Sequence, residues 1–275
     1  MVTPEKRIDL GQDDQEIQRL TAQHKIMSSC YEKLILAPID LSKPGLRILD
    51  SACADGLWLR AVQPSIASPH TLVGTDINPN FFPSSPPPQI EHQAQDITKP
   101  WPADWANIFD LVHSRLGLGA CGPFGVENSV KNMIALVKPG GWIQLDEMDL
   151  VGEQNLPGTG GELGRIIRAL FEKIGSQWDF ANHMKKWLLE AGLEDVEETT
   201  IHVKFGKSNP DPEIAKLGIW SMTTSTRAVC FAGKKMGLKE FTEEELETMG
   251  DRCEKELTEK GIDSPMISVW GRKPI

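Results

Sequence analysis

One pattern repeats along the chain: a short apolar run, a turn of small or polar residues, and then a stretch whose apolar side chains recur at helical spacing. The apolar runs predict strands at 46–50, 71–75, 90–94, 109–113, 142–145, 196–205 and 266–272. Helices are predicted at 13–36, 56–63 and 126–137, with further helices inside 160–191. Because strands alternate with helices, the pattern predicts an α/β fold with a doubly wound sheet.

Two segments interrupt this alternation. Prolines fill the stretch from Phe81 to Gln89, so a loop is expected where a short helix would otherwise follow the second strand. Residues 209–261 are expected to form a helical insertion. Its last helix begins at a capping box of Thr242 and Glu245 and ends at Gly261. The apolar stripe of this helix is Leu246, Met249, Cys253 and Leu257.

The turn after the first strand carries the clearest chemical signal. The strand ends in Asp50-Ser51-Ala52-Cys53-Ala54-Asp55-Gly56, a series of very small residues, and the second strand ends near Asp76. A turn of small residues lets the backbone approach a ligand, and a carboxylate at the end of the second strand can accept hydrogen bonds from a ribose. The layout predicts a βαβ unit that binds an adenosine-containing ligand. The alternative is an ordinary turn that binds nothing.

The spacing of the small residues within the turn indicates which class of adenosine-containing ligand it would bind. Ala52, Ala54 and Gly56 are each two residues apart, unlike the G-x-G-x-x-G pattern of nicotinamide-binding folds. In this turn, and in Arg19-Leu20 followed by Gln23-His24, the chain resembles class I S-adenosylmethionine (SAM)-dependent methyltransferases, specifically small fungal enzymes of secondary metabolism. It departs from the family where alanines stand in place of two expected glycines. Alanine costs little there unless its φ is positive.

The resemblance implies an overall organisation. It implies a Rossmann-like sheet of seven strands with an antiparallel last strand, and one methyltransferase domain over 1–275. Within that domain, residues 1–45 would form a helical lid and residues 46–150 the SAM-binding core. Residues 151–186 and 206–262 would be helical cap insertions. These inserts would either cover the carboxyl ends of the strands or build a homodimer.

The resemblance also assigns roles to residues that would hold SAM and release S-adenosylhomocysteine. Asp76 would accept bonds from the ribose diol, Asp96 would accept from the adenine amino group, and Ile97 would pack on the ring. Asp50 would act on the methionine ammonium, or would merely cap the turn. The full set expected to contact SAM is Gln23, Asp50, Ser51, Ala52, Gly56, Asp76, Ile77, Asp96, Ile97 and His113.

Candidate catalytic residues follow from chemistry and position. His113 ends the fourth strand and would be either a general base or a histidine that fixes the backbone, because its ordinary pKa lies near neutrality. His24 would lie in the lid near the methionine carboxylate, or would be a satisfied core histidine. Glu147 leaves the fifth strand and would act as a base or face water.

The acceptor would lie beside these groups. Arg115 could hold a carboxylate of the acceptor, or pair structurally with Asp110 or Glu147. The remaining candidates for the acceptor pocket are Asp149, Trp178 and Trp220, with ordinary core packing as the alternative for the tryptophans.

Composition limits the partners and the compartment. The chain of 275 residues carries a formal net charge of −10 and has no clustered Lys and Arg, so nucleic acid is not an expected partner. Its five cysteines are scattered without C-x-x-C spacing, so neither a metal site nor a disulfide framework is expected. No long apolar run suggests a membrane span. We therefore expect a cytoplasmic enzyme that acts on a small molecule.

Other functions stay open at this stage. The fold could bind SAM and catalyse a cyclisation without methyl transfer, since fold does not settle function. It could be a methyltransferase-like regulator that works through partner proteins. A nicotinamide enzyme is disfavoured by the spacing of the turn.

Overall fold

The computed structural model describes residues 13–275, so the first 12 residues of the predicted lid lie outside the described part of the chain. Seven strands form one sheet in the order β3-β2-β1-β4-β5-β7-β6. Their bounds are β1 (Arg47–Ser51), β2 (Thr71–Asp76), β3 (Ile90–Ala94), β4 (Phe109–Arg115), β5 (Val137–Met148), β6 (Glu194–Phe205) and β7 (Ile262–Arg272). This sheet confirms the predicted doubly wound, Rossmann-like fold class.

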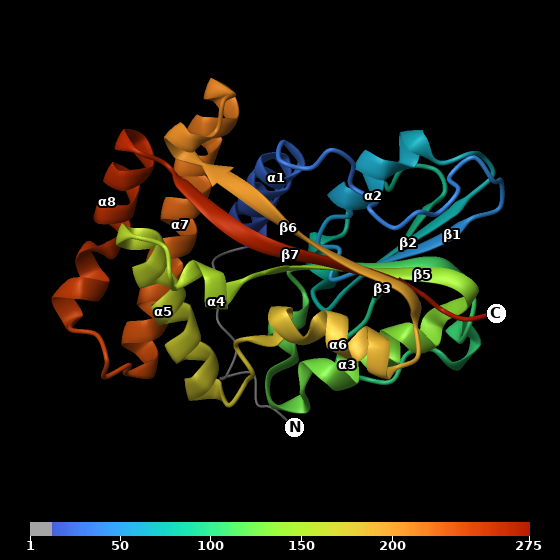
Figure 1. The fold of residues 1–275 in the computed structure, drawn as a ribbon. Helices are drawn as coiled ribbons and strands as arrows, with labels where there is room; N and C mark the ends of the chain where they lie inside the picture. The colour runs from blue at the N-terminus through green and yellow to red at the C-terminus, as the bar shows by residue number, and fades with distance from the viewer. Residues whose placement is uncertain (1–12) are drawn as a thin grey trace. The chain divides into compact units, whose positions relative to one another are not determined.

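Strand pairing places the ends of β1, β2 and β4 at one edge. β1 lies between β2 and β4 and is parallel to both, with Asp50 opposite Gly74 on one side and opposite His113 on the other. The last strand runs the other way, as predicted. Lys273, just after β7, exchanges backbone hydrogen bonds with Gly140 and Gly141 near the start of β5, and Figure 1 shows β7 running opposite to β5.

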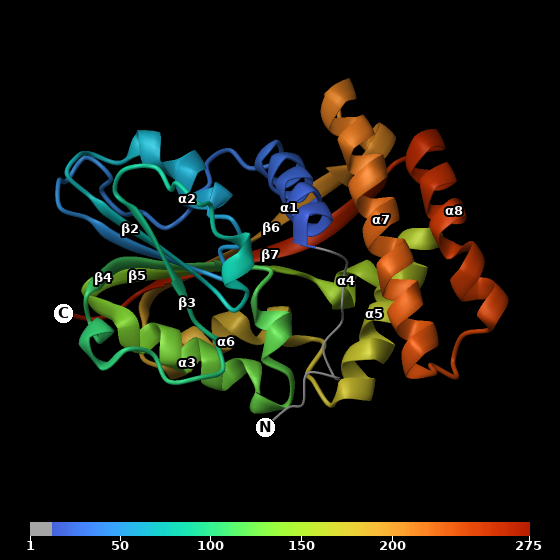
Figure 2. The ribbon, with the colours of Figure 1, turned by 180° about the vertical axis from the view of Figure 1, so that it is seen from behind.

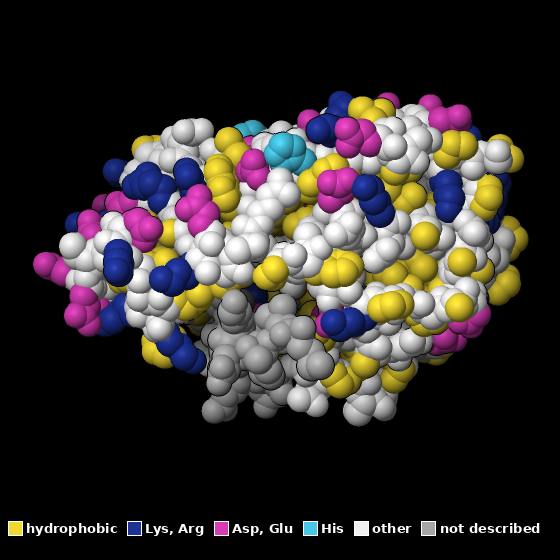
Figure 3. Space-filling view, turned by 90° about the horizontal axis from the view of Figure 1, so that it is seen from below, with side chains coloured by type: hydrophobic (Ala, Val, Ile, Leu, Met, Phe, Trp, Pro, Cys, Tyr) yellow, Lys and Arg dark blue, Asp and Glu magenta, His cyan; other side chains and the backbone are white. Residues whose placement is uncertain are grey.

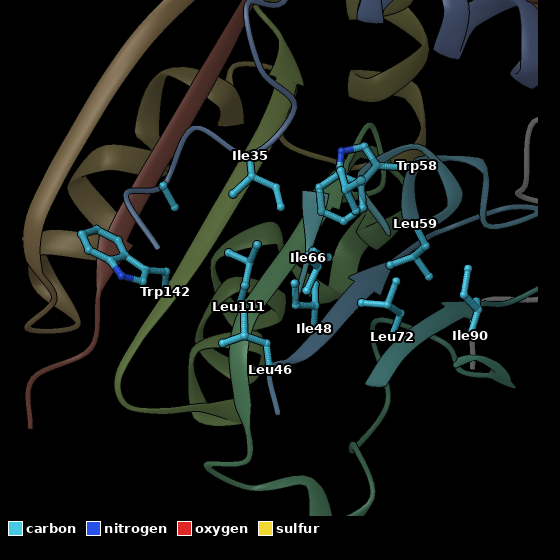
Figure 4. Close-up of a cluster of buried hydrophobic side chains, with 12 residues drawn as sticks. Ile35, Leu46, Ile48, Trp58, Leu59, Ile66, Leu72, Ile90, Leu111 and Trp142 are labelled. Carbon is cyan, nitrogen blue, oxygen red and sulfur yellow. The ribbon is translucent and has the colours of Figure 1, made fainter. Parts of the chain in front are cut away.

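A buried apolar cluster holds the first half of the sheet to the helix that follows β1. The helix α2 (Leu57–Val62) contributes Trp58 and Leu59, which pack on Ile48 and Leu72 of the sheet. Figure 4 shows these side chains pointing toward one another from α2 and the strands. Helices α3 (Val126–Leu136) and α6 (Met184–Glu190) cover the opposite face (Figures 1 and 2). Burial on both faces explains the apolar pairs in the middle of β1, β2 and β4, which are Ile48–Leu49, Leu72–Val73 and Leu111–Val112.

The contacts of the chain fall into two compact units. One unit holds residues 33–147, 180–200 and 267–275, which include β1 to β5. Among the described residues, the other unit holds 13–32, 148–179 and 201–266, and it is mainly helical. Its helices are α1 (Asp13–Ser28), α4 (Leu150–Glu153), α5 (Gly158–Ile174), α7 (Pro212–Met236) and α8 (Glu243–Glu259). Helices α5, α7 and α8 fall within the segments 151–186 and 206–262, and the role of these segments as cap insertions stays a prediction.

Helix α8 agrees with its prediction in detail. Thr242 accepts from the backbone amide of Glu245 at 3.2 Å, and the Glu245 carboxylate accepts from the Thr242 amide at 2.7 Å. The four residues of the predicted stripe are all buried. Gly261 has a φ of +82°, a value that glycine reaches without strain.

Of the element boundaries that differ from the prediction, the end of the first helix and the start of β5 differ most. The first helix ends at Ser28 rather than at residue 36. The Cys30 amide donates to the Met27 carbonyl at 2.8 Å, three residues back, and the Leu36 amide donates to the Gln144 side chain at 2.7 Å, so neither amide makes the i→i−4 bond of an α-helix. The strand predicted at 142–145 begins already at Val137, and a register irregularity against β4 lies in this early part of β5.

Candidate functional site

The turn after β1, which we call the donor turn (residues 51–56), holds three residues in the left-handed region. The φ of Ala52 is +59°, that of Ala54 is +50° and that of Gly56 is +75°. An L-residue in this region costs about 1 to 2 kcal/mol, so both alanines carry strain that glycine would avoid. The condition under which alanine becomes costly is therefore met at both positions. Such strain is found at functional sites where the surroundings hold the backbone in place.

Asp76 fixes this strained turn to the end of β2. Its two carboxylate oxygens accept backbone amides, one from Ala54 at 2.9 Å and one from Asn78 at 3.0 Å. Burial raises the pKa of Asp76, and the hydrogen bonds from these amides oppose that rise. A carboxylate has about four acceptor positions, and the Ile77 amide also bonds to this one, so about one position remains for a ligand hydroxyl group. Asp76 thus lies where a ribose acceptor is expected.

The neighbouring adenine candidates lie along the same edge. Ile77 follows Asp76 and is 43% exposed, which is high for an apolar residue beside a buried carboxylate. Asp96 follows β3, and its carboxylate accepts from the Thr98 amide at 2.9 Å and from the Thr98 hydroxyl at 2.7 Å. Ile97 is buried. The structure therefore brings Asp76, Ile77 and Asp96 to the ends of adjacent strands, as the resemblance implies.

The loop after β4 closes on the donor turn, and sequence reasoning missed it. A Cβ placed on Gly117 would lie 2.6 Å from the Ala52 Cβ and 2.9 Å from the Ser114 hydroxyl oxygen. No residue larger than glycine fits there without movement. The Ser114 hydroxyl is buried and has no hydrogen-bond partner among the described residues. Gly117 therefore lets the loop after β4 pack directly against the donor turn, next to a buried hydroxyl. The glycines at 117 and 119, after a strand end, were the signal available in the sequence.

Glu147 anchors this loop from β5. Its carboxylate accepts from the Leu118 amide at 2.8 Å, and the side chain is almost fully buried. Burial raises the pKa of Glu147 to about 8, and the amide hydrogen bonds from Leu118 and Gly117 oppose that rise. Of the two roles expected for Glu147, a carboxylate facing water is therefore wrong. A carboxyl group with a pKa near neutrality can also take up a proton, so the catalytic role stays a prediction.

His113 lies between two carboxylates in the middle of the sheet. Its Nδ1 lies 2.7 Å from an Asp50 oxygen and its Nε2 lies 2.9 Å from an Asp146 oxygen. The imidazole is fully buried and stacks on the Trp58 ring at a centroid distance of 3.7 Å. Both ring nitrogens are therefore occupied. This geometry favours the histidine that fixes its surroundings over the general base, and Asp146 is a site residue that sequence reasoning did not find.

Small residues complete the donor turn. Ser51 and Cys53 are buried, and the Cys53 amide donates to the Thr75 carbonyl at 2.9 Å. Burial raises the pKa of the Cys53 thiol well above its usual range, because nearby carboxylates add to the effect of desolvation. A thiol of this kind is unreactive. Gly56 begins α2, and a Cβ there would lie 2.5 Å from the His92 ring. The turn thus needs small residues at several positions.

The candidates on α1 belong to the helical unit. His24 is buried, and its Nε2 lies 3.2 Å from the Ser28 hydroxyl. Gln23 is half-buried. Arg19 is buried and forms a two-pronged ion pair with Glu16, at 2.8 and 2.6 Å. The Ser28 hydroxyl thus gives His24 a hydrogen-bond partner within its own helix. The approach of Gln23 and His24 to SAM stays a prediction, because the donor turn belongs to the other unit.

The acceptor candidates divide between the units. Arg115 ends β4 and is half-buried, in the unit of the donor turn. Asp149 caps α4 by accepting from the Gly152 amide at 2.9 Å, and the Trp178 ring carries the Arg168 guanidinium 4.6 Å from its centroid. Trp220 is 39% exposed on α7. Asp149, Trp178 and Trp220 belong to the helical unit, so a common acceptor pocket stays a prediction.

Two features are absent from residues 13–275. No group of three or more His, Cys, Asp or Glu side chains there could hold a metal ion. No helix in the same part of the chain is both long and apolar enough to cross a bilayer.

Comparisons with known proteins agree with this geometry. A family described as a methyltransferase domain matches residues 22–198. The chain is 36% identical to the N-methyltransferase sirN of Leptosphaeria maculans, over 98% of this chain and 96% of that protein. It is 32% identical to the N-methyltransferase gliN of Aspergillus fumigatus, over 96% of both chains.

A solved structure shares the fold. The putative methyltransferase in the complex with the Trm112 activator of Haloferax volcanii has a TM-score of 0.57 and is 14% identical, over 95% of this chain and 96% of that one.

Proposed function

Because the chain belongs to the methyltransferase family, we propose that it transfers the methyl group of SAM to a nitrogen atom of a small natural product. SAM is the methyl donor, and when bound it supplies a methyl carbon already activated by a sulfonium. The single observation that carries the nitrogen assignment is the pair of N-methyltransferases that are 36% and 32% identical to this chain over almost its whole length.

The residues of the donor site have separate tasks. Asp76 would accept hydrogen bonds from the ribose, Asp96 and Ile77 would contact the adenine, and Asp50 would meet the charged end of the methionine portion. The small residues of the donor turn let the backbone approach that ligand. Alignment and exclusion of water are what these residues contribute to an SN2 displacement at carbon.

A nitrogen acceptor must also lose a proton before or after transfer. An alkylamine is protonated at neutral pH and must lose a proton before its lone pair can attack, and an amide nitrogen needs a base because its lone pair is delocalised. Glu147, with its pKa of about 8, and His24 are the groups of this chain proposed for that task. We also propose Arg115, Asp149, Trp178 and Trp220 as acceptor contacts.

Partners and compartment belong to the same proposal. We propose a small-molecule acceptor, without nucleic acid or membrane as a partner, and an enzyme that works in the cytoplasm as a monomer or homodimer. All five cysteines are free, which suits a reducing compartment. Figure 3 supports the exclusion of nucleic acid, because Lys and Arg on that face are interspersed with Asp and Glu.

The test combines binding with product analysis. Calorimetric titration of SAM into the wild type and Asp76→Ala comes first, and we expect micromolar binding that the variant loses. Candidate amines and amides are then incubated with SAM labelled with ¹³C at the methyl group. The carbon shift of the new methyl and its coupling to neighbouring atoms identify the methylated atom. A product methylated on oxygen, sulfur or carbon would overturn the nitrogen assignment, and an absence of SAM binding would overturn the donor site.

A further inference from the structure

A buried chain of charged groups runs from the donor turn into the sheet. Asp50, at the end of β1, contacts His113 of β4, and His113 contacts Asp146 of β5, at 2.7 and 2.9 Å. The Gln144 amide also donates to the Asp146 oxygen at 3.1 Å. At most 3% of any residue in the Asp50–His113–Asp146 series is exposed. Charged groups rarely occupy such positions unless they are paired.

The positions of the two carboxylates around His113 determine the protonation state of its ring. An imidazole whose two nitrogens both face carboxylate oxygens must donate from both, because a lone pair facing a carboxylate is repelled. Burial alone would lower the pKa of His113, but the hydrogen bonds that the ring donates to Asp146 and Asp50 outweigh it and raise that pKa above its ordinary value. The hydrogen bond from His113 correspondingly lowers the pKa of Asp146, against the effect of its burial. Trp58 stacks on the ring, which favours a cation.

The series ends at the donor turn. One Asp50 oxygen binds His113, and Asp50 directly precedes the donor turn with its strained residues Ala52 and Ala54. The orientation of the Asp50 carboxylate is therefore set by His113, whose own orientation is set by Asp146. Asp146 is in turn next to Glu147, which holds the loop that carries Gly117.

We propose that His113 and Asp146 are positioning residues that fix the Asp50 carboxylate for binding of the methionine end of SAM, with His113 as a permanent imidazolium rather than a general base. The inference rests on the donor site of the proposed function. It does not depend on which acceptor atom is methylated.

Two substitutions of His113 separate positioning from stability. The amide nitrogen of Asn takes the place of Nδ1, so His113→Asn keeps a donor for Asp50 and loses the bond to Asp146. The amide nitrogen of Gln takes the place of Nε2, so His113→Gln keeps the bond to Asp146 and loses the bond to Asp50. Both remove the same charge from the same site, and we expect similar falls in the melting temperature.

Donor binding should distinguish the two variants. We expect His113→Gln to weaken SAM binding about tenfold and His113→Asn about threefold, because only the former frees the Asp50 carboxylate from its donor. Asp146→Asn should weaken binding in the wild type and add little in His113→Asn, since Asp146 acts through His113. His202→Asn, which removes an exposed histidine 3.4 Å from Asp263, is the matched control and should bind SAM as the wild type does.

Nuclear magnetic resonance of the ring nitrogens tests the charge directly, without any ligand. The ionisable groups that face His113 are Asp50 from β1 and Asp146 and Glu147 from β5, and Trp58 of α2 adds no charge. We expect both His113 nitrogens to stay protonated at about pH 7.5.

Either of two results overturns the inference. One is a neutral His113 at that pH, and the other is equal SAM affinity in both His113 variants. If the His113 variants do not fold, two measurements still test the inference. These are the ring-nitrogen spectrum of the wild type and the SAM affinity of Asp146→Asn. If wild type binds no SAM, the donor site of the proposed function has failed, whereas the ring spectrum still reports on the buried series.

Discussion

Ala52 and Ala54 occupy backbone conformations that suit glycine, and a substitution can measure the cost. Relief of the left-handed strain exceeds the extra entropy that glycine has in the unfolded chain. We therefore expect Ala52→Gly and Ala54→Gly each to raise the free energy of unfolding by about 0.5 to 1 kcal/mol. Chemical denaturation measures this value. Unchanged or lower stability in both variants would show that the positive φ angles do not strain the turn.

The facing loop offers a steric test of the same turn. Gly117 has a φ of −97°, so alanine is tolerated by its backbone but not by its surroundings. We expect Gly117→Ala to lower the free energy of unfolding by about 1 to 3 kcal/mol through the contact with the Ala52 Cβ. Adding Ala52→Gly should restore part of the loss, because the Ser114 contact remains. Simple additivity of the two changes would refute a direct contact.

Glu147 should make stability depend on pH in a known direction. Its pKa is raised from 4.5 to about 8, so between these values the folded protein keeps a proton that the unfolded chain has lost. Stability contributed by this group therefore falls as pH rises through that window. Glu147→Gln removes the fall while keeping an acceptor for the Leu118 amide. We expect its melting temperature to exceed that of wild type by at least about 4 °C near pH 8 and to approach it near pH 4.5.

The control for that prediction is Glu197→Gln, at an exposed position of β6. Its difference from wild type should not vary over the same pH range. A Glu147→Gln variant whose difference is likewise independent of pH would contradict the raised pKa. If Glu147 also takes the acceptor proton, the Gln variant keeps its fold and loses turnover.

Residues that act within one strand–turn–strand segment could be predicted from the sequence, and residues that act across strands could not. Asp76 and the donor turn are about 20 residues apart and linked by the known geometry of a βαβ unit. Asp146 and Gly117 reach the same site from β5 and from the loop after β4. Their contacts depend on strand register, which a single sequence does not specify. Candidates such as His113 could be found, but its two carboxylate partners could not.

At the scale of elements, the cap of α8 can be tested separately. Thr242→Ala removes a side chain that accepts from the Glu245 amide, and we expect a loss of about 1 kcal/mol in the free energy of unfolding. Thr258→Ala is the matched control within the same helix, because Thr258 bonds only to the Glu254 carbonyl one turn back. It should change stability little, since alanine has the higher helix propensity. Equal losses in both variants would contradict a special role for the cap.

Elements with strong local signals were predicted closely, and the errors lie where tertiary contacts override local preference. The capping box and buried stripe of α8 are properties of its own sequence. The end of α1 is not determined by its own sequence, because Leu36 and Ala37 in the following segment bond to Gln144 of β5. Similarly, Lys138 to Gly141 has the composition of a turn, yet pairing with Lys273 keeps it in the sheet.

At the scale of the whole molecule, charge predicts the behaviour toward nucleic acids. The net charge of −10 would repel a phosphate backbone, and many basic side chains are already paired, such as Arg272 with Glu194 and Asp195. We expect no binding to labelled duplex DNA or RNA at about 50 mM salt in fluorescence anisotropy. A basic DNA-binding protein serves as positive control. Binding that weakens steeply with salt would contradict the expectation.

The contact between Ala52 and Gly117 has a consequence for how such sites evolve. The family pattern reserves the smallest residue for the turn itself, yet here the turn carries a methyl group and the opposite loop carries the glycine. The free volume beside the ligand is thus a shared property of two segments, and either one can supply it. Compensating exchanges between the two positions would leave the site's shape unchanged. A search for relatives that requires glycine in the donor turn would then discard family members that carry the glycine in the loop after β4 instead.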